Sequence, residues 1–140
     1  MRRLALFVAF FVASLATVGI ALRGASLAYA GESIQQADLQ RFYQEINSES
    51  FDGKLPDVPV RWSDLTDTDA YGITRFDHGV PYAMELDRQT VHSKSFAMDV
   101  IRHESCHIAT NAEAKRRKED PHGATFVSCM ARILETDTAD

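Results

Sequence analysis

The sequence predicts a small α+β domain in which three helices pack on a three-stranded antiparallel sheet, preceded by an N-terminal signal or anchor helix. Three observations lead to this prediction. The first 30 of the 140 residues are almost free of charge, whereas the rest of the chain is rich in charged residues. Three short segments then alternate between apolar and polar residues, which is typical of half-buried strands. Segments with apolar residues three and four positions apart precede and follow them, and this spacing predicts amphipathic helices.

The N-terminal segment has the pattern of an export signal. Two arginines precede an uncharged apolar run, residues 4–22, and Ala28-Tyr29-Ala30 follows it as an A-x-A cleavage pattern. The run is longer than a usual signal-peptide core and long enough to span a bilayer, so a cleaved signal and an uncleaved membrane anchor both stay open. Either way we expect residues 31–140 to form the exported domain, which is periplasmic, secreted or anchored outside the cytoplasmic membrane.

The first helix of the domain is predicted to start at a capping box formed by Ser33 and Gln36, and to end near Ser48. Its inner face is an apolar stripe: Leu39, Phe42, Tyr43 and Ile46. Gly53 and Pro56 mark a turn after it. The first strand is then predicted from alternating apolar residues at Val58, Val60 and Trp62, and Pro59 favours a strand start or a sheet edge.

Two more strands are predicted on either side of a turn at residues 77–79, which read Asp-His-Gly. The first covers residues 70–76, after a polar loop at residues 63–70. The second contains an alternating apolar set: Tyr82, Met84 and Leu86. Because so short a turn joins them, we expect an antiparallel hairpin.

Two helices complete the predicted domain. One starts at Ser93 or Ser95, either of which can act as N-cap, and ends at about Thr110. The other follows Gly123 and has an apolar face: Phe126, Met130 and Ile133. We expect residues 111–122 to connect the two helices, with the basic run at 115–118 as a solvated loop face.

Charge and cysteine content narrow the choice of function. Residues 1–30 hold three arginines and no acid, so the remainder has 12 basic and 20 acidic residues and a net charge of −8. So acidic a domain is unsuited to non-specific nucleic-acid binding, and we expect a monomer whose partner is a protein or peptide. Cys106 and Cys129 form either a disulfide, as an oxidising compartment allows, or two small apolar positions on helices.

The strongest functional signal is HESCH, residues 103–107. On a helix, His103 and His107 share one face one turn apart, so both imidazoles can reach one ion. Glu104, beside the first histidine, can act as a base on a metal-bound water. A catalytic zinc needs a third protein ligand, and His122, in a turn at DPHG, is chemically the best candidate. The weaker candidates are Glu113, Glu119, Glu135, Asn111, His78 and His92.

The chain resembles the SprT-like zinc metallopeptidase family. The resemblance rests on YQEINSESFDGKLPDVPVRW at residues 43–62, the strand with Gly72, HESCH, and HGATFVSCMARI at residues 122–133, in this order. It implies a small zincin-like domain that binds Zn²⁺. It also implies ligand roles for His103, His107 and His122 and a catalytic acid/base role for Glu104. Phe126 and Met130 are expected to pack beneath the site.

The sequence departs from the family pattern in three ways. Family members often carry a four-cysteine zinc ribbon, whereas this chain has two cysteines. Known members are mainly intracellular and some act on proteins attached to DNA, whereas this domain is predicted to be exported and acidic. Ile108 replaces the alanine that is usual after the second histidine. We therefore expect an exported or envelope protein as substrate.

The sequence thus predicts a zinc metalloendopeptidase in which Glu104 activates a zinc-bound water. An extended substrate is expected to add to a sheet edge, supplied by residues 74–76 or residues 84–88. The candidates for a donor to the developing oxyanion are Tyr71, Tyr82, His78 and His92. The alternative is an exported zinc-binding domain that binds a protein partner without cleaving it, although a purely structural zinc does not need a base like Glu104.

Overall fold

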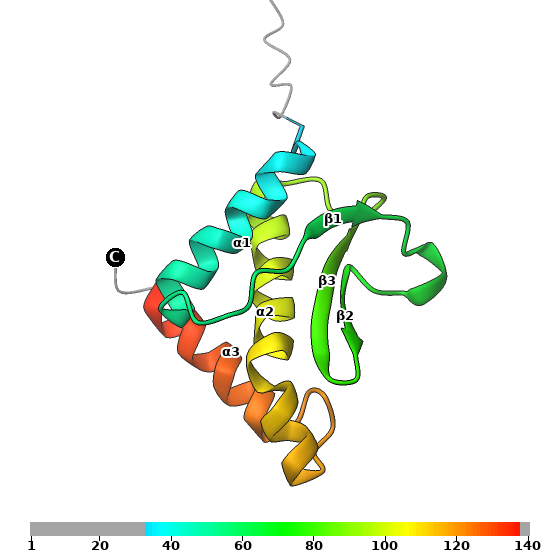
Figure 1. Ribbon diagram of the computed structural model, residues 1–140. Coiled ribbons are helices and arrows are strands. Elements are labelled where there is room, and N and C mark those ends of the chain that lie inside the picture. Colours follow the sequence, from blue (N-terminus) through cyan, green and yellow to red (C-terminus); the bar gives the residue numbers. More distant parts are fainter. Residues whose placement is uncertain (1–32, 138–140) are drawn as a thin grey trace, which may run out of the picture.

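The computed structural model describes residues 33–137 and is drawn in Figure 1. The predicted export signal lies outside these residues, and within them no helix has the length and apolarity to cross a membrane. The class is α+β, and the predicted order of one helix, three strands and two helices is confirmed. The elements are α1 (Gln36–Phe51), β1 (Val60–Ser63), the short 3-10 helix η1 (Thr66–Thr68), β2 (Gly72–Asp77), β3 (Val80–Asp87), α2 (Lys94–Arg117) and α3 (Ala124–Asp137).

The sheet is mixed, so the prediction of a fully antiparallel sheet is wrong. Its strand order is β1-β3-β2. β2 and β3 form the expected antiparallel hairpin, but β1 runs parallel to β3, with Val60 opposite Met84 and Ser63 opposite Asp87. The loop at residues 64–71, which contains η1, carries the chain past the position of β3 to the far edge. Hydrophobic alternation indicates which face of a strand is buried, and it does not indicate which strands are neighbours.

The start and end of α1 differ slightly from the prediction. The N-cap is Gln35 instead of Ser33, and its backbone N–H donates to Asp38 Oδ2 at 2.8 Å. The helix continues past Ser48 to Phe51, whose ring is buried in the core. Asp52 then adopts a left-handed conformation (φ 53°) and ends the helix, which is a common form of helix termination.

Two glutamines of α1 cover the outer edge of β1. Gln36 Nε2 donates to the carbonyl of Val60 at 2.7 Å, and Gln36 Oε1 accepts from the Trp62 N–H at 3.1 Å. Gln40 Oε1 accepts from the Val60 N–H at 2.9 Å, and Gln40 Nε2 donates to the Val58 carbonyl at 3.2 Å. Because these side chains satisfy the backbone groups of β1, β2 is left as the open edge of the described sheet.

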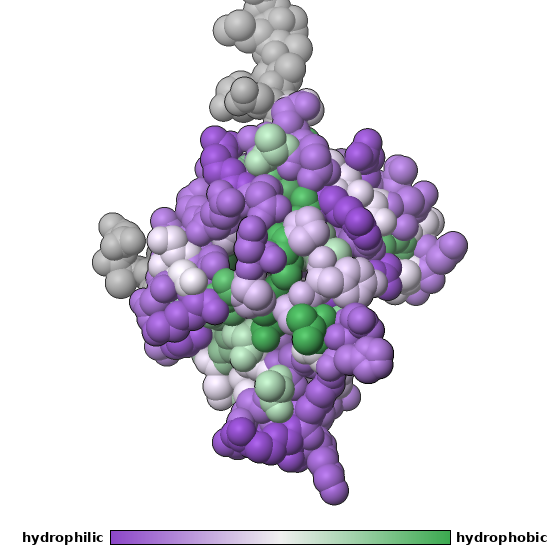
Figure 2. All heavy atoms as spheres, in the orientation of Figure 1, coloured by the Kyte–Doolittle hydropathy of each residue, from purple (hydrophilic) through white to green (hydrophobic). Residues whose placement is uncertain are grey.

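α2 lies at the centre of the fold, between the sheet and the other two helices (Figure 1). The core around it includes fully buried side chains from α1, β3 and α2: Leu39, Tyr43, Ile46, Met84, Leu86 and Ile101. On the face drawn in Figure 2, hydrophilic residues dominate and apolar ones gather in the middle, between α1 and the sheet. The HESCH segment therefore lies on the helix that contacts both the sheet and the other two helices.

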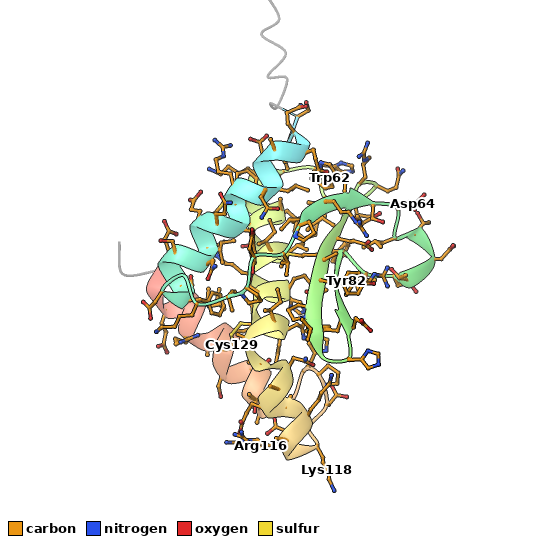
Figure 3. The ribbon with its side chains drawn as sticks, in the orientation of Figure 1. Trp62, Asp64, Tyr82, Arg116, Lys118 and Cys129 are labelled. Carbon is orange, nitrogen blue, oxygen red and sulfur yellow. A yellow bond between two sulfur atoms is a disulfide. The ribbon has the colours of Figure 1, made fainter. Side chains whose placement is uncertain are left out.

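α2 is longer than predicted. It starts after Ser93, whose Oγ accepts from the Phe96 N–H at 3.2 Å, as the sequence suggests. It continues seven residues beyond Thr110, so the basic run forms its last turn and C-cap instead of a loop, and Arg116 and Lys118 are at its tip in Figure 3. This segment is rich in alanine, glutamate, lysine and arginine, which favour helices, and cations near a helix C-terminus are stabilising.

A disulfide joins α2 to α3. Cys106 and Cys129 are bonded, their Cα atoms are 5.8 Å apart, and both side chains are buried. The choice left open by the sequence is thus decided in favour of a disulfide. α3 starts directly after Gly123, as predicted, and Cys129 is labelled on it in Figure 3.

Candidate metal centre

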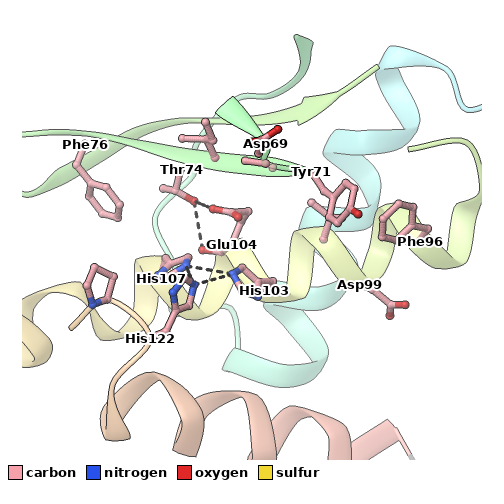
Figure 4. A pocket seen from close by; sticks show the side chains of 15 residues that line it. Asp69, Tyr71, Thr74, Phe76, Phe96, Asp99, His103, Glu104, His107 and His122 are labelled. Carbon is pink, nitrogen blue, oxygen red and sulfur yellow. Dashed lines mark hydrogen bonds between the residues drawn. The ribbon is translucent and has the colours of Figure 1, made fainter. Parts of the chain in front are cut away.

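The three predicted histidine ligands meet in space (Figure 4). His103 and His107 project from successive turns of α2, and His122 projects from the turn that leads into α3. Their Nε2 atoms are 3.1, 3.1 and 3.2 Å apart. Two nitrogens that bind one zinc at tetrahedral angles, each at about 2.05 Å, are about 3.3 Å apart. The cluster could therefore hold a metal ion, and the donor set fits zinc.

Burial favours the neutral form, which binds metals, in the two imidazoles of α2, those of His103 and His107. Burial, followed by the charge of His122, lowers the pKa of His103. Burial and the charges of His103 and His122 lower the pKa of His107 to about 4. Only a neutral imidazole has a free nitrogen lone pair for a metal. At neutral pH these two ligands thus need not release a proton to bind a metal.

Phe126 of α3 packs against all three imidazoles. Its ring centroid lies 4.8 Å from that of His103, 4.5 Å from that of His107 and 4.8 Å from that of His122. The expected place of Phe126 beneath the cluster is confirmed, while Met130 packs at the border of the hydrophobic core. Since the disulfide also joins α3 to α2, two contacts fix the start of α3 relative to HESCH.

Glu104 is buried next to the histidines and is only 4% exposed. Its carboxylate Oε2 accepts a hydrogen bond from Thr74 Oγ1 of β2 at 2.8 Å. Burial raises the pKa of Glu104, and the hydrogen bonds with Thr74 oppose that rise. Burial thus makes the Glu104 carboxylate a better proton acceptor than a carboxylate in water.

The close approach of β2 to α2 depends on Gly72. A Cβ atom at this position would lie 2.5 Å from Val100 Cγ1 and 3.2 Å from Glu104 Cγ. Such distances are too short for unperturbed packing, so glycine allows the strand to lie directly over the start of HESCH.

A cleft of about 610 Å³ lies between β2 and α2 and contains the cluster. One end is lined by Tyr71 and Phe96, whose rings make an edge contact at 5.1 Å between centroids. Phe76 and Pro121 line the cleft too, and Figure 4 shows Phe76 on the other side of the histidines from Tyr71. Further lining residues are Asp69, Ala70, Gly72, Ile73, Thr74, Asp99, Val100, His103, Glu104, His107 and His122.

The open edge of β2 borders this cleft. The Tyr71 carbonyl accepts from the Asp87 N–H at 2.9 Å and so points towards β3. Backbone groups of successive strand residues point to opposite edges, so those of Gly72 and Thr74 point to the open edge. Of the two edges proposed for a substrate, residues 74–76 belong to this open strand. Residues 84–87 belong to β3, which is the central strand and has no open edge. The prediction that residues 84–88 supply the substrate-binding edge is therefore wrong.

The other candidate ligands lie outside the cluster, and several have different partners. Glu113 pairs with Arg116 and Arg117 on the surface of α2. Asn111 lies inside α2, and its Nδ2 donates to the Gly79 carbonyl at 2.9 Å. Neighbouring groups engage two more candidates, since Glu119 accepts from the Thr125 N–H and His78 contacts Asp77. His92 and Glu135 also lie outside the cluster.

Thr74 is the site residue that sequence reasoning missed. It lies 30 positions before Glu104, and a threonine in a strand has no distinctive pattern. The one signal in the sequence is its register: Thr74 is two residues from Gly72, so both side-chain positions face α2.

The fold and the site together define the class of protein. It is a small α+β domain with a three-histidine cluster that could bind a metal beside a buried glutamate. The model of the SprT-like family matches residues 39–139, which include the cluster and nearly the whole described domain. The chain belongs to the SprT-like family. No curated protein matches the chain.

Proposed function

We propose that this protein is a zinc-dependent metalloendopeptidase that hydrolyses peptide bonds of an exported or envelope protein. One observation supports this function above the others: three clustered imidazoles and one buried carboxylate open into the same cleft, beside an open strand edge. Membership of the SprT-like family is consistent with it.

His103, His107 and His122 would hold the zinc, which when bound polarises the scissile carbonyl and makes a water molecule more acidic. Glu104 accepts the proton of the attacking water and then donates it to the leaving amine as the carbon–nitrogen bond breaks. Its raised pKa suits a group that must take a proton and give it back. Of the four residues considered as oxyanion donors, Tyr71 lines the cleft, and we assign it that role.

The substrate is proposed to bind as an extended segment along β2. Gly72 and Thr74 offer it backbone hydrogen bonds from the open edge. The aromatic rings at both sides of the histidines, among them Tyr71 and Phe76, favour apolar side chains near the scissile bond. The acidic surface makes nucleic acid an unsuitable partner.

The buried disulfide supports export. Disulfides persist in oxidising compartments and are rare in the cytosol. Together with the signal-like pattern of residues 1–30, the Cys106–Cys129 bond favours a periplasmic, secreted or externally anchored domain at residues 31–140. Residues 4–22 would serve as the anchor if they are not removed.

The first test is metal content. We expect the purified domain to contain about one zinc per chain, and His122→Ala to lose most of it, because a site with two ligands binds zinc weakly. His92→Ala is the control, since His92 lies outside the cluster. Equal zinc content in the wild type and His122→Ala would contradict the proposed site.

The second test separates a peptidase from a non-catalytic zinc-binding domain. Glu104→Gln keeps the size of the side chain and removes its basicity, so we expect it to retain zinc and lose cleavage of a peptide library by at least about 100-fold. Glu113→Gln, on the exposed face of α2, is the matched control. A zinc-loaded wild type that cleaves no more than Glu104→Gln would favour the binding domain.

A further inference from the structure

We infer that Thr74 is a positioning residue that holds the Glu104 carboxylate in place and links it to the strand that receives the substrate. The inference rests on the proposed peptidase function. It assigns Thr74 no contact with the reacting atoms, because it acts through Glu104.

The hydrogen bond between the two side chains is the first argument. Thr74 Oγ1 lies 2.8 Å from Glu104 Oε2 and 3.3 Å from the Glu104 carbonyl oxygen, so its single proton is best donated to the carboxylate. Among the described residues, no other side chain hydrogen-bonds to this carboxylate. Figure 4 shows the contact spanning the cleft from β2 to α2.

Burial makes this contact consequential. A carboxylate on the surface has water as an alternative partner, but Glu104 is only 4% exposed. The hydrogen bonds from Thr74 restrict the rotamers of this buried carboxylate. Without the Thr74 hydroxyl, Glu104 would keep its chemistry and lose the side-chain contact that orients its carboxylate.

The second argument is the place of Thr74 in the sheet. Its side chain faces α2, and by strand alternation its backbone N–H and carbonyl lie on the open edge of β2, where the N–H also contributes a hydrogen bond to the Glu104 carboxylate. One residue thus contacts the base and offers its backbone carbonyl to an extended peptide. A peptide paired with β2 would be aligned with the base through a single residue of a rigid strand.

Kinetics with isosteric variants test this role. Thr74→Val replaces the hydroxyl by a methyl group and keeps a residue that favours strands. We expect kcat to fall about 10- to 100-fold with little change in KM, because a misplaced base affects the transition state and not substrate binding. Thr74→Ser keeps a hydroxyl and should restore most of the lost kcat.

The matched control is Thr90→Val. Thr90 Oγ1 also donates to a carboxylate, Asp87 Oδ2, at 2.7 Å, but it does not line the cleft. Its loss should lower stability and leave kcat and KM unchanged. If Thr74→Val and Thr90→Val have the same kcat, or if Thr74→Ser is as slow as Thr74→Val, the inference is wrong.

A double-mutant cycle in the metal-free domain gives a readout that does not need activity. The melting temperatures of Thr74→Val, Glu104→Ala and the double variant are compared with that of the wild type, because Glu104→Ala removes the accepting oxygens that a glutamine would keep. If the two side chains interact, the double variant should lose less than the sum of the single losses, by about 4 °C or more. Additive losses overturn the inference even if the wild type is active. Conversely, an inactive wild type with clear coupling contradicts the peptidase function and leaves the hydrogen bond established.

Discussion

At the scale of single residues, the site was predictable wherever helix geometry alone decides the positions. His103 and His107 are four residues apart on one helix, so their shared face follows from the sequence. His122 needed the family pattern, because the turn that carries it has no periodicity. The contact between Thr74 and Glu104 depends on how a strand packs on a helix, and nothing local in the sequence specifies that packing.

Ser105, within HESCH, leads to a first prediction. Its side chain is fully buried, and its hydroxyl has no hydrogen-bond partner among the described residues. A buried hydroxyl without a partner is destabilising, so Ser105→Ala should raise the free energy of unfolding by about 0.5–1 kcal/mol. Denaturant unfolding of the metal-free domain measures this.

Thr110 provides the comparison for Ser105. It is also buried in α2, but its Oγ1 donates to the Cys106 carbonyl at 2.7 Å. Thr110→Val should therefore lower stability by about 1 kcal/mol. A loss of stability in Ser105→Ala would show that the serine hydroxyl has a partner after all.

Glu85 leads to a prediction about pH. Its side chain is buried on β3 between Arg61 and Arg75, with contacts of 2.5 and 2.9 Å. The hydrogen bond with Arg61 and those with Arg75 lower the pKa of Glu85, although burial opposes them. A lowered pKa in the folded state adds stability at pH values above the unfolded pKa of about 4.5, and this stability is lost as the pH falls through the folded value.

The expected result follows from the lowered pKa of Glu85 in the folded state. At pH 7, Glu85→Gln should be about 1–2 kcal/mol less stable than the wild type, and the difference should shrink as the pH falls from the unfolded pKa of about 4.5 through the lower folded pKa. Urea unfolding of both proteins at pH 7 and pH 3 measures it. A difference that is the same at both pH values would mean that the charge of Glu85 does not contribute.

At the scale of elements, the sequence predicted the type and order of the three α-helices and the three strands, and it missed η1, the parallel pairing of β1 and the full length of α2. The parallel pairing of β1 was missed because it depends on the path of the loop at residues 64–71. The length of α2 was missed because polar residues after Thr110 were assigned to a connection. In fact, Asn111 and Lys115 of this extension reach the hairpin turn, where Asn111 hydrogen-bonds to the Gly79 carbonyl and Lys115 lies over the Phe76 ring.

The packing of β2 on α2 can be tested at Gly72. Gly72→Ala should lower the free energy of unfolding by about 1–3 kcal/mol, because the new methyl group overlaps Val100. It should also reduce peptidase activity, since the methyl group approaches Glu104 Cγ as well.

A compensating substitution identifies the cause. Adding Val100→Ala to Gly72→Ala removes the closest atom, so the double variant should be more stable than the two single effects predict. Thermal unfolding of the four proteins completes the cycle. Strictly additive effects would place the strain of Gly72→Ala somewhere other than at Val100.

At the scale of the whole molecule, the fold joins its two ligand-bearing segments covalently. The disulfide closes a loop with a sequence separation of 23 residues between α2 and α3. Without this cross-link the unfolded chain has more conformational entropy, which lowers the free energy of unfolding by about 3 kcal/mol. The double variant Cys106→Ala/Cys129→Ala should lose about that much stability and bind zinc more weakly, because the turn with His122 is less constrained.

Calorimetric unfolding and zinc titration measure these two effects. Ser128→Ala is a suitable control on α3, since Ser128 is exposed and its hydroxyl bonds only within the helix. Should the cysteine double variant unfold like the wild type, the bond does not contribute to the stability of the domain. Unchanged zinc affinity would mean that the disulfide is not needed to hold the third ligand in place.

Under the proposed function, the glutamines that cover β1 have a consequence for which proteins this domain can cleave. With the β1 edge occupied by Gln36 and Gln40, the described sheet offers an incoming chain one open edge, that of β2, beside the histidines. To pair there, a chain must already be extended, with its own backbone bonds open over several residues. Under the proposed function, the domain would therefore distinguish targets by conformation before sequence: well-folded neighbours in the same compartment would be spared, and misfolded or frayed ones cleaved.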